Sequence, residues 1–473
     1  MTREEAVLTT LVVYKLGLLV LGWVGSRRTK DDADFYLGGR GLSPLVAAVS
    51  SAASSSSAWT LLGVSGAAYA WGVGALWLFP ACVGGFALNW YVLAPGLQRL
   101  SRDSGALTVT GLLAGEGRDG TSRAVRIVAS VILLGSLGFY VCSQLQAAGK
   151  SFEATFDLDP TASVLIGAAI VLVYTLAGGF WAVSLTDTLQ GLLMAGAAVL
   201  LPTVALVEVG GPGELWAAMG AVDVPGFTSL TRHYEPAAGV GFIAGLLGVG
   251  LGYPGQPHVV NRFMALRDDP KALVAGRRIA MAWAVSVYAG MLLLGWSGRV
   301  LLAELPDGET VFVALANELL SPVMAGIVLA AVLSAIMSTA DSQLLVAGSA
   351  VTHDLGLAGT SHRTMLLRSR LTVFALMVGA AVAAVTTDES IFRLVLFAWG
   401  AMGAAFGPLL LVTALRGPVS RGRTLVAMIV GAGLSITAYY GFPDAEAKAL
   451  ERVFPFVVVF AILLMPGGRR TSD

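Results

Sequence analysis

The chain has 473 residues, of which 56% are hydrophobic and 13% are charged, and its mean hydropathy is +0.77. A soluble protein of this length needs a more polar surface, so the composition excludes a soluble fold and indicates a polytopic membrane protein. The formal net charge is zero, which gives no support to nucleic-acid binding.

Apolar segments long enough to cross a bilayer follow one another along the whole chain, and none reads as a strand. We expect an all-α polytopic membrane protein with about thirteen transmembrane helices, forming a single transporter-sized domain over residues 1–473. The expected spans are 6–26, 45–70, 72–97, 124–149, 161–179, 185–207, 237–261, 277–303, 322–350, 367–387, 390–414, 424–441 and 452–466.

The distribution of Lys and Arg predicts the orientation in the membrane. An odd number of spans places the termini on opposite sides, and cytoplasmic loops carry the excess of Lys and Arg. The N-terminus is therefore expected outside and the C-terminus in the cytoplasm. The basic flanks are 27–44, 98–123, 262–278, 351–370, 415–423 and 467–473, whereas the alternate loops are acidic.

The second span contains a run of serines, SSAASSSSAW, at residues 50–59. Serine side chains compete for backbone hydrogen bonds, so this run favours a local unwinding that frees carbonyl oxygens for a cation. Transporters use such broken helices to bind ions and substrates near the membrane midplane. The alternative is that these small residues allow close packing of helices.

The seventh span is interrupted by the stretch GYPGQP at residues 252–257. It lies five spans after the serine run, and because five is odd, two such units are inserted in opposite orientations. The pattern predicts an inverted repeat, with a first unit over about 45–207 and a second over about 237–414. Taken singly, this break is also consistent with a simple helix kink.

Two aspartates, Asp187 and Asp341, lie within or at the edge of expected spans. An ionised carboxylate in the membrane is costly unless it is paired or hydrated, so both residues are candidates for function. For Asp187 the alternative is a structural role at the cytoplasmic start of its helix, where a negative charge stabilises the helix dipole.

The ninth span carries Ala335, Ser338, Thr339 and Ser342 at positions i, i+3, i+4 and i+7, on one helical face. Hydroxyl and carbonyl oxygens without a thiolate or an imidazole favour an alkali cation over a transition metal. The alternative is that the hydroxyls bond back to the preceding helical turn.

Five motifs in order carry a resemblance to a known family. The chain resembles the sodium/solute symporter family, and most closely its sodium/proline symporter branch. The resemblance implies a five-plus-five inverted repeat (the LeuT-like fold) with one extra N-terminal and two extra C-terminal helices. The motifs are FYLGGRGLSPLVAAVSSAASSSSAW, YTLAGGFWAVSLTDTLQGLLM, GLGYPGQPHVVNRFMAL, LSAIMSTADSQLLVAGSAVTHDL and AWGAMGAAFGP.

The resemblance also implies where sodium binds, between the break in the second span and the ninth span. The implied ligands are Ala53, Ser56, Ala335, Ser338 and Thr339. A possible second cation or a sodium exit route is implied at Asp187, Asp341 and Ser342.

A substrate pocket is implied beside the sodium site. Proline transporters of the family have a tryptophan where Val249 stands and an aspartate where Ser55 stands, and this tryptophan helps to wall their pocket. The residues implied to line the pocket here are Ser57, Trp59, Tyr140, Val249, Tyr253 and Pro257.

The expected function is sodium-coupled symport of a small organic solute by alternating access, with proline or a related amino or carboxylic acid as substrate. The alternatives are another solute (pantothenate, a short monocarboxylate, a sugar or sialic acid) or a membrane solute sensor. The absence of a nucleophile with a neighbouring base argues against an enzyme. Sodium, the solute and the lipid bilayer of a bacterial inner (plasma) membrane are the expected partners of a functional monomer.

Overall fold

The computed structural model describes residues 2–26, 37–115, 119–175, 180–302, 304–356, 362–442 and 448–465. Within these ranges nearly all of the chain is helical, and a single isolated bridge, Leu42 to Leu266, takes the place of any sheet. The prediction of an all-α protein is confirmed.

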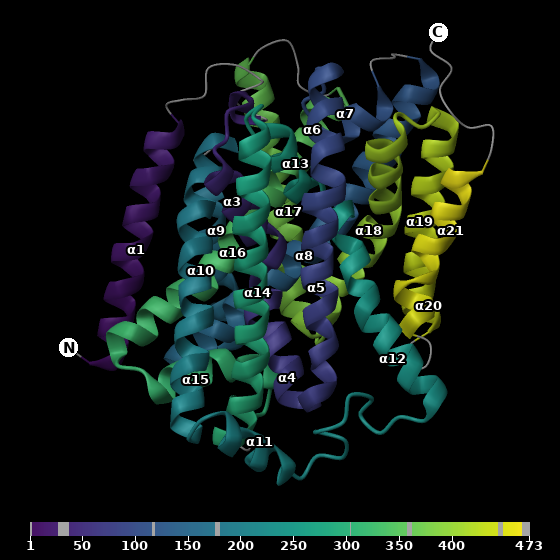
Figure 1. Ribbon diagram of the computed structural model, residues 1–473. Helices are drawn as coiled ribbons and strands as arrows, with labels where there is room; N and C mark the ends of the chain where they lie inside the picture. The colour runs from purple at the N-terminus through teal and green to yellow at the C-terminus, as the bar shows by residue number, and fades with distance from the viewer. Residues whose placement is uncertain are drawn as a thin grey trace.

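The helices follow one another along the chain with short connections (Figure 1). The first half comprises α1 (Arg3–Ser26), α3 (Pro44–Ala58), α4 (Ser65–Trp71), α5 (Leu78–Ala87), α6 (Ala94–Asp103), α7 (Val109–Ala114), α8 (Gly120–Phe156), α9 (Pro160–Thr175), α10 (Phe180–Val209) and α11 (Pro212–Gly220). The second half comprises α12 (Pro236–Gly248), α13 (Pro257–Ala265), α14 (Pro270–Leu301), α15 (Val311–Leu319), α16 (Pro322–Ser349), α17 (His362–Thr386), α18 (Ile391–Arg416), α19 (Arg421–Gly441), α20 (Lys448–Arg452) and α21 (Phe454–Leu464).

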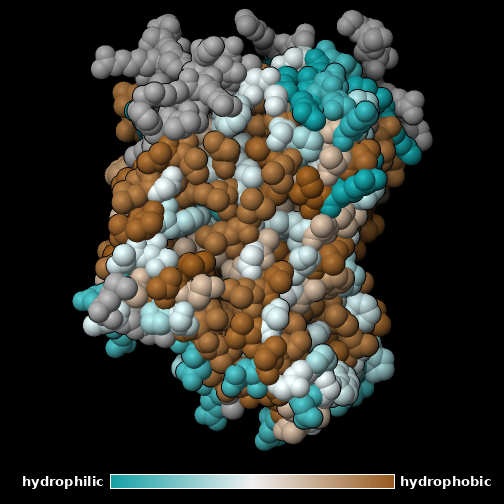
Figure 2. Space-filling view, turned by 60° about the vertical axis from the view of Figure 1, so that its left-hand side comes forward, coloured by the Kyte–Doolittle hydropathy of each residue, from teal (hydrophilic) through white to brown (hydrophobic). Residues whose placement is uncertain are grey.

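Ten helical segments of the described chain are long and apolar enough to cross a membrane, and two shorter apolar helices lie in α9 and α21. One of the ten, Pro44–Asp103, is 60 residues long and makes two passes, because the chain reverses at Gly72. Gly72 has φ +59°, and a Cβ there would lie 1.9 Å from the Phe227 carbonyl oxygen, so this turn needs glycine. The ten segments therefore account for eleven of the thirteen predicted passes, and the shorter helices α9 and α21 lie where the other two spans, 161–179 and 452–466, were predicted. Hydrophobic side chains cover the middle of the molecule, and hydrophilic ones gather at its two ends (Figure 2).

Both predicted helix interruptions are present. In α3, Ser57 has φ 51° and ψ −176°, so the helix breaks inside the serine run. Between α12 and α13 the chain forms a tight helical turn, η5 (Val249–Gly255), which contains Pro254. A Cβ on Gly255 would lie 2.5 Å from the Cα of Gly403 in α18, so glycine lets the second break pack directly against that helix.

Arginines join the basic connections at one end of the molecule, drawn at the top of Figure 1. Arg40 donates to the Ala106 carbonyl (2.8 Å), and Arg102 donates to the Leu266 carbonyl (2.7 Å). The start of α3 and the end of α13 meet at this end, whereas the start of α1 lies at the opposite end.

Candidate cation and substrate site

Oxygen atoms of α3 and α16 meet beside the break in α3. The Thr339 hydroxyl lies 3.4 Å from the Ala53 carbonyl oxygen and 3.3 Å from that of Ser54. The Ser54 hydroxyl in turn lies 3.3 Å from the Ser338 carbonyl oxygen, and the Ser338 hydroxyl lies 3.3 Å from the Ala335 carbonyl oxygen. All five residues are buried. The structure thus brings together four of the five residues expected to bind sodium.

The fifth residue, Ser56, is also buried, and its hydroxyl has no hydrogen-bond partner among the described residues. Its carbonyl lies at the break and accepts hydrogen bonds from the Trp59 amide and the Thr60 hydroxyl. The oxygens around Thr339 are neutral hydroxyls and carbonyls, which suit a hard monovalent ion that must bind and be released. The donor set therefore fits sodium.

Asp187 lies in α10 and is completely buried. Its Oδ2 accepts hydrogen bonds from the hydroxyls of Ser50 (2.9 Å), Ser54 (3.2 Å) and Ser342 (3.4 Å). Because α10 begins at Phe180, Asp187 lies about two turns inside the helix, beyond the reach of the helix-end effect. The alternative role at the helix start is therefore wrong.

Arg262 of α13 is the counter-ion of Asp187, and the sequence did not predict this role. Its Nη2 lies 2.9 Å from the Asp187 Oδ2, and only 1% of the side chain is exposed. The guanidinium also donates to the Ser50 hydroxyl (3.1 Å) and the Ser342 hydroxyl (2.5 Å), and it lies over the Phe180 ring. We name Asp187, Arg262, Ser50, Ser54 and Ser342 the inner network; it joins α3, α10, α13 and α16.

The sequence places Arg262 in the basic flank 262–278, as a loop residue, and this prediction is wrong. Helix α13 continues to Ala265, which carries Arg262 into the protein interior. A buried arginine is tolerated there because Asp187 neutralises it, and two serine hydroxyls and the His258 carbonyl accept hydrogen bonds from its other N–H groups. Helix α13 begins at the last residue of the GYPGQP stretch and carries Arg262. A basic residue so close after the predicted break is the sequence signal that could have identified it.

Asp341 and Ser342 are adjacent in sequence but face different neighbours. Ser342 belongs to the inner network, whereas the Asp341 Oδ1 accepts a hydrogen bond from Thr175 of α9. The Asp341 Oδ2 is buried and has no hydrogen-bond partner among the described residues. Lys15 of α1 reaches the same helix, where its ammonium contacts Met337. The three residues expected to form one second-cation group are therefore divided between two places.

Aromatic rings from three other helical segments surround Trp399 of α18. Its ring centroid lies 5.2 Å from that of Trp59, 4.9 Å from that of Tyr253 and 6.3 Å from that of Tyr140. The structure thus brings together three of the six residues expected to line the substrate pocket, around a tryptophan that was not predicted. Trp399 lies within the AWGAMGAAFGP motif, so its motif was recognised but its contact with the other aromatic residues was not.

Three buried polar atoms around Trp399 make no hydrogen bond of good geometry among the described residues: the Trp59 Nε1, the Trp399 Nε1 and the Tyr140 hydroxyl, which lies near Ser57 and Trp399. Each can donate a hydrogen bond, and buried donors are costly unless a ligand or water completes them. The Tyr253 hydroxyl, by contrast, is bonded to the Tyr288 hydroxyl (2.6 Å), so Tyr253 offers its ring face alone.

Backbone N–H groups at the break are satisfied within the chain. The Ala58 amide donates to the Gln144 side chain (3.1 Å), and the Trp59 amide donates to the Ser57 hydroxyl (3.1 Å). Neither amide is therefore open to a substrate carboxylate in this structure. Of the remaining predicted pocket residues, Val249 begins η5 and lines a small cavity with Trp399, and Pro257 begins α13.

Two interrupted helices that meet continuous helices at buried oxygens and aromatic rings define a secondary transporter of the inverted-repeat type. The model of the sodium:solute symporter family matches residues 35–431, and the chain belongs to this family.

Similar proteins agree over nearly the whole chain. The sodium/proline symporter of Escherichia coli (strain K12) is 35% identical over 482 residues, covering 98% of this chain and 94% of that protein. The osmoregulated proline transporter OpuE of Bacillus subtilis (strain 168) is 36% identical over 435 residues, covering 90% and 87%. A solved structure, a substrate-bound outward-open state of a Na+-coupled sialic acid symporter, covers 100% of both chains with a TM-score of 0.78 and 19% identity.

The predicted LeuT-like, five-plus-five fold and the predicted family are confirmed by these comparisons. The chain is an integral membrane protein and a sodium-coupled symporter of a small solute. It is a transporter and not an enzyme.

Proposed function

We propose that this symporter takes up proline, or a closely related amino or carboxylic acid, together with sodium. The observation that carries the proposal lies at the break in α3. There, the oxygen-lined contact between α3 and α16 lies beside the aromatic cluster around Trp399. The two relatives described above are proline transporters, which supports the choice of proline. The three open donors suit a carboxylate, and the ring faces suit an apolar ring.

Sodium binds, on this proposal, to the carbonyl oxygens of Ala53, Ser56 and Ala335 and to the hydroxyls of Ser338 and Thr339. The 3.4 Å contact between Thr339 and Ala53 supports it, because an ion there links the broken helix α3 to α16. Binding then stabilises the state in which these helices are close and the aromatic cluster beside them is assembled. When the helices separate, both ligands are released.

The inner network is, in the same proposal, the barrier on the side of the sodium exit route. Its Asp187–Arg262 pair joins α13 to α10 where α13 must move for the site to open. Arg262 holds the Asp187 carboxylate that a second sodium ion needs, so Asp187, Asp341 and Ser342 form an exit route instead of a permanent second site.

We further propose one transmembrane domain over residues 1–473, with repeat units over about 45–207 and 237–414, that works as a monomer. The basic connections gathered at one end support a cytoplasmic location for that end and for the C-terminus. The N-terminus then lies outside a bacterial inner membrane.

Uptake by proteoliposomes tests the function. With an inward sodium gradient, labelled proline should accumulate, and replacing sodium by choline should abolish accumulation. Unlabelled pantothenate, acetate, glucose and sialic acid are added as competitors. Sodium-dependent uptake of the sugar with no response to any carboxylate would contradict the proposed substrate class, and binding without uptake would indicate a sensor.

Exchange of Val249 for tryptophan tests the substrate pocket. Val249 is 4% exposed and lies one helical turn before Tyr253, beside Trp399. A tryptophan adds an aromatic wall there, so Val249→Trp should favour proline over bulkier competitors by about fivefold, the scale of about 1 kcal/mol for an aromatic contact. Competition against labelled proline measures the shift, with Val249→Leu as the control for added volume. Equal preferences in the tryptophan and leucine variants would remove Val249 from the pocket.

A further inference from the structure

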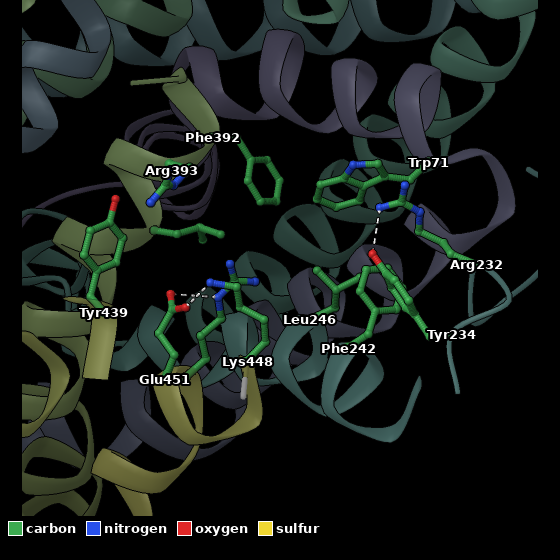
Figure 3. A pocket seen from close by; sticks show the side chains of 12 residues that line it. Trp71, Arg232, Tyr234, Phe242, Leu246, Phe392, Arg393, Tyr439, Lys448 and Glu451 are labelled. Carbon is green, nitrogen blue, oxygen red and sulfur yellow. Dashed lines mark hydrogen bonds and ion pairs between the residues drawn. The ribbon is translucent and has the colours of Figure 1, made fainter. Parts of the chain in front are cut away.

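A second cavity is lined by residues of α12, α18 and α20 (Figure 3). Helices α12 and α20 lie toward the end of the molecule where α1 begins (Figure 1). The cavity has a volume of about 360 Å³, within the range of small-ligand pockets. We name it the outer cavity. The side chains that the argument uses are Trp71, Arg232, Phe392, Arg393, Glu451 and Arg452.

Positive charge dominates the outer cavity. Arg232, Arg393, Lys448 and Arg452 line it, and Glu451 is the one carboxylate among its lining residues. Glu451 is bonded to Lys448 (2.5 Å) and lies 3.4 Å from the Arg452 Nε, so it neutralises one charge at most. Arg393 is paired with Glu389, which is not among the lining residues (3.1 Å). Four basic side chains against Glu451 and Glu389 still leave an excess of positive charge, which attracts anions into a partly enclosed space.

Arg452 has donors to spare. Its Nε faces Glu451, while its two terminal amino groups donate to no acceptor among the described residues. Only 15% of its side chain is exposed. A largely buried guanidinium with free amino groups has the geometry that binds a carboxylate through two parallel hydrogen bonds.

Arg452 also lies between the outer cavity and the central aromatic cluster. It lines the small cavity that contains Val249 and Trp399 as well as the outer cavity, and Leu396 is shared in the same way. Phe392 separates the two regions, since its ring lies 5.5 Å from Trp59 on one side and 5.2 Å from Trp71 on the other.

The Phe392 barrier is anchored at the start of α18. Glu309 accepts hydrogen bonds from the amides of Phe392 (2.8 Å) and Ile391 (3.1 Å), and it pairs with Lys150 of α8 (2.6 Å). These contacts fix Phe392 between the central aromatic cluster and the outer cavity. A ligand bound in the outer cavity would lie next to Phe392, on the side away from that cluster.

The C-terminal residues of this cavity lie outside the part of the chain that the family model matches. That match ends at residue 431, whereas Tyr439, Lys448, Glu451 and Arg452 follow it. These residues belong to α19 and α20, helices that pack around the transport core. The extra C-terminal helices thus contribute chemistry and not packing alone.

We propose that the outer cavity binds the carboxylate of small organic acids, including the transported amino acid, before they pass Phe392, and that Arg452 positions this carboxylate. The inference rests on the proposed uptake of an amino or carboxylic acid. Binding at the outer cavity should need no sodium. The cavity is already positively charged, and the oxygens proposed to bind sodium lie elsewhere, between α3 and α16. The rings of Trp71 and Phe392 provide apolar contacts for the rest of the solute.

Arg452→Gln in the full-length protein tests the site. The KM for proline uptake should rise about fivefold at low ionic strength, the effect of losing one partly exposed charge contact, while the maximal rate and the sodium dependence stay unchanged. Added choline chloride should weaken the effect through screening. Arg452→Lys should recover part of the affinity, and Arg416→Gln, an exposed arginine at the opposite end, should behave as wild type.

Direct binding without sodium separates this inference from the proposed function. Acetate and proline should bind the purified wild-type protein weakly, prolinamide should not, and Arg452→Gln should lose the binding. Equal binding of prolinamide, or an unchanged KM in Arg452→Gln beside intact sodium-dependent uptake, overturns the site alone. Absent proline uptake with retained, Arg452-dependent acetate binding overturns the proposed substrate alone. If Arg452→Gln does not fold, Arg393→Gln should give a smaller rise in KM, and no rise overturns the site.

Discussion

Asp187→Asn is expected to slow sodium-driven uptake by about 30-fold or more, since removing one charge of a buried pair costs about 2–5 kcal/mol. The amide still reaches Ser50 and Ser54, but Arg262 keeps a buried charge without its counter-ion. The state closed at the inner network is destabilised, and the transport cycle is interrupted. Substrate binding at saturating sodium should persist, because the aromatic cluster does not contact Asp187.

The double variant Asp187→Asn/Arg262→Gln separates two roles of the carboxylate. If Asp187 serves only to neutralise Arg262, uptake should recover in the double variant, since neither charge remains. If the carboxylate also guides sodium along the exit route to the cytoplasm, protein stability should recover while the rate stays low. Asp354→Asn is the matched control, because Asp354 is buried and accepts a hydrogen bond from Thr108 but does not contact Arg262. Wild-type uptake in Asp187→Asn would show that the pair is structural.

Thr339→Ala is expected to raise the sodium concentration for half-maximal uptake by about fivefold, the effect of losing one polar contact worth about 1 kcal/mol. The hydroxyl lies near the carbonyl oxygens of Ala53 and Ser54 across the α3–α16 contact, where the ion is proposed to bind. Proline binding at saturating sodium should be nearly unchanged. Ser338→Ala should behave in the same way.

Sodium titration of proline binding to the purified variants provides the measurement. Thr203→Ala is the control, since Thr203 is exposed on α10 and its hydroxyl bonds back to the Val199 carbonyl (2.6 Å). An unchanged sodium dependence in both the Thr339 and Ser338 variants would place the ion elsewhere.

Local sequence patterns determined the membrane class, the helical spans and the two interruptions. Each span can be recognised from the hydropathy of its own residues. The serine run and the GYPGQP stretch likewise interrupt the helix at their own positions. The helical spacing of Ala335, Ser338 and Thr339 also indicated an oxygen-lined face before any partner was known. The family motifs then indicated which faces meet.

Tertiary structure alone decided the partners of the buried side chains. Arg262 reads as one more basic loop residue until α13 carries it inward to Asp187, 75 positions away in sequence. Asp341 and Ser342 are neighbours in sequence, yet successive side chains on a helix point about 100° apart, so they face different helices. Trp399 and Arg452 likewise gain their roles from helices far away in the chain. The spacing of residues along a helix determines which face a side chain occupies. Which charge, hydrogen-bond donor or ring that side chain contacts depends on how helices distant in the sequence pack.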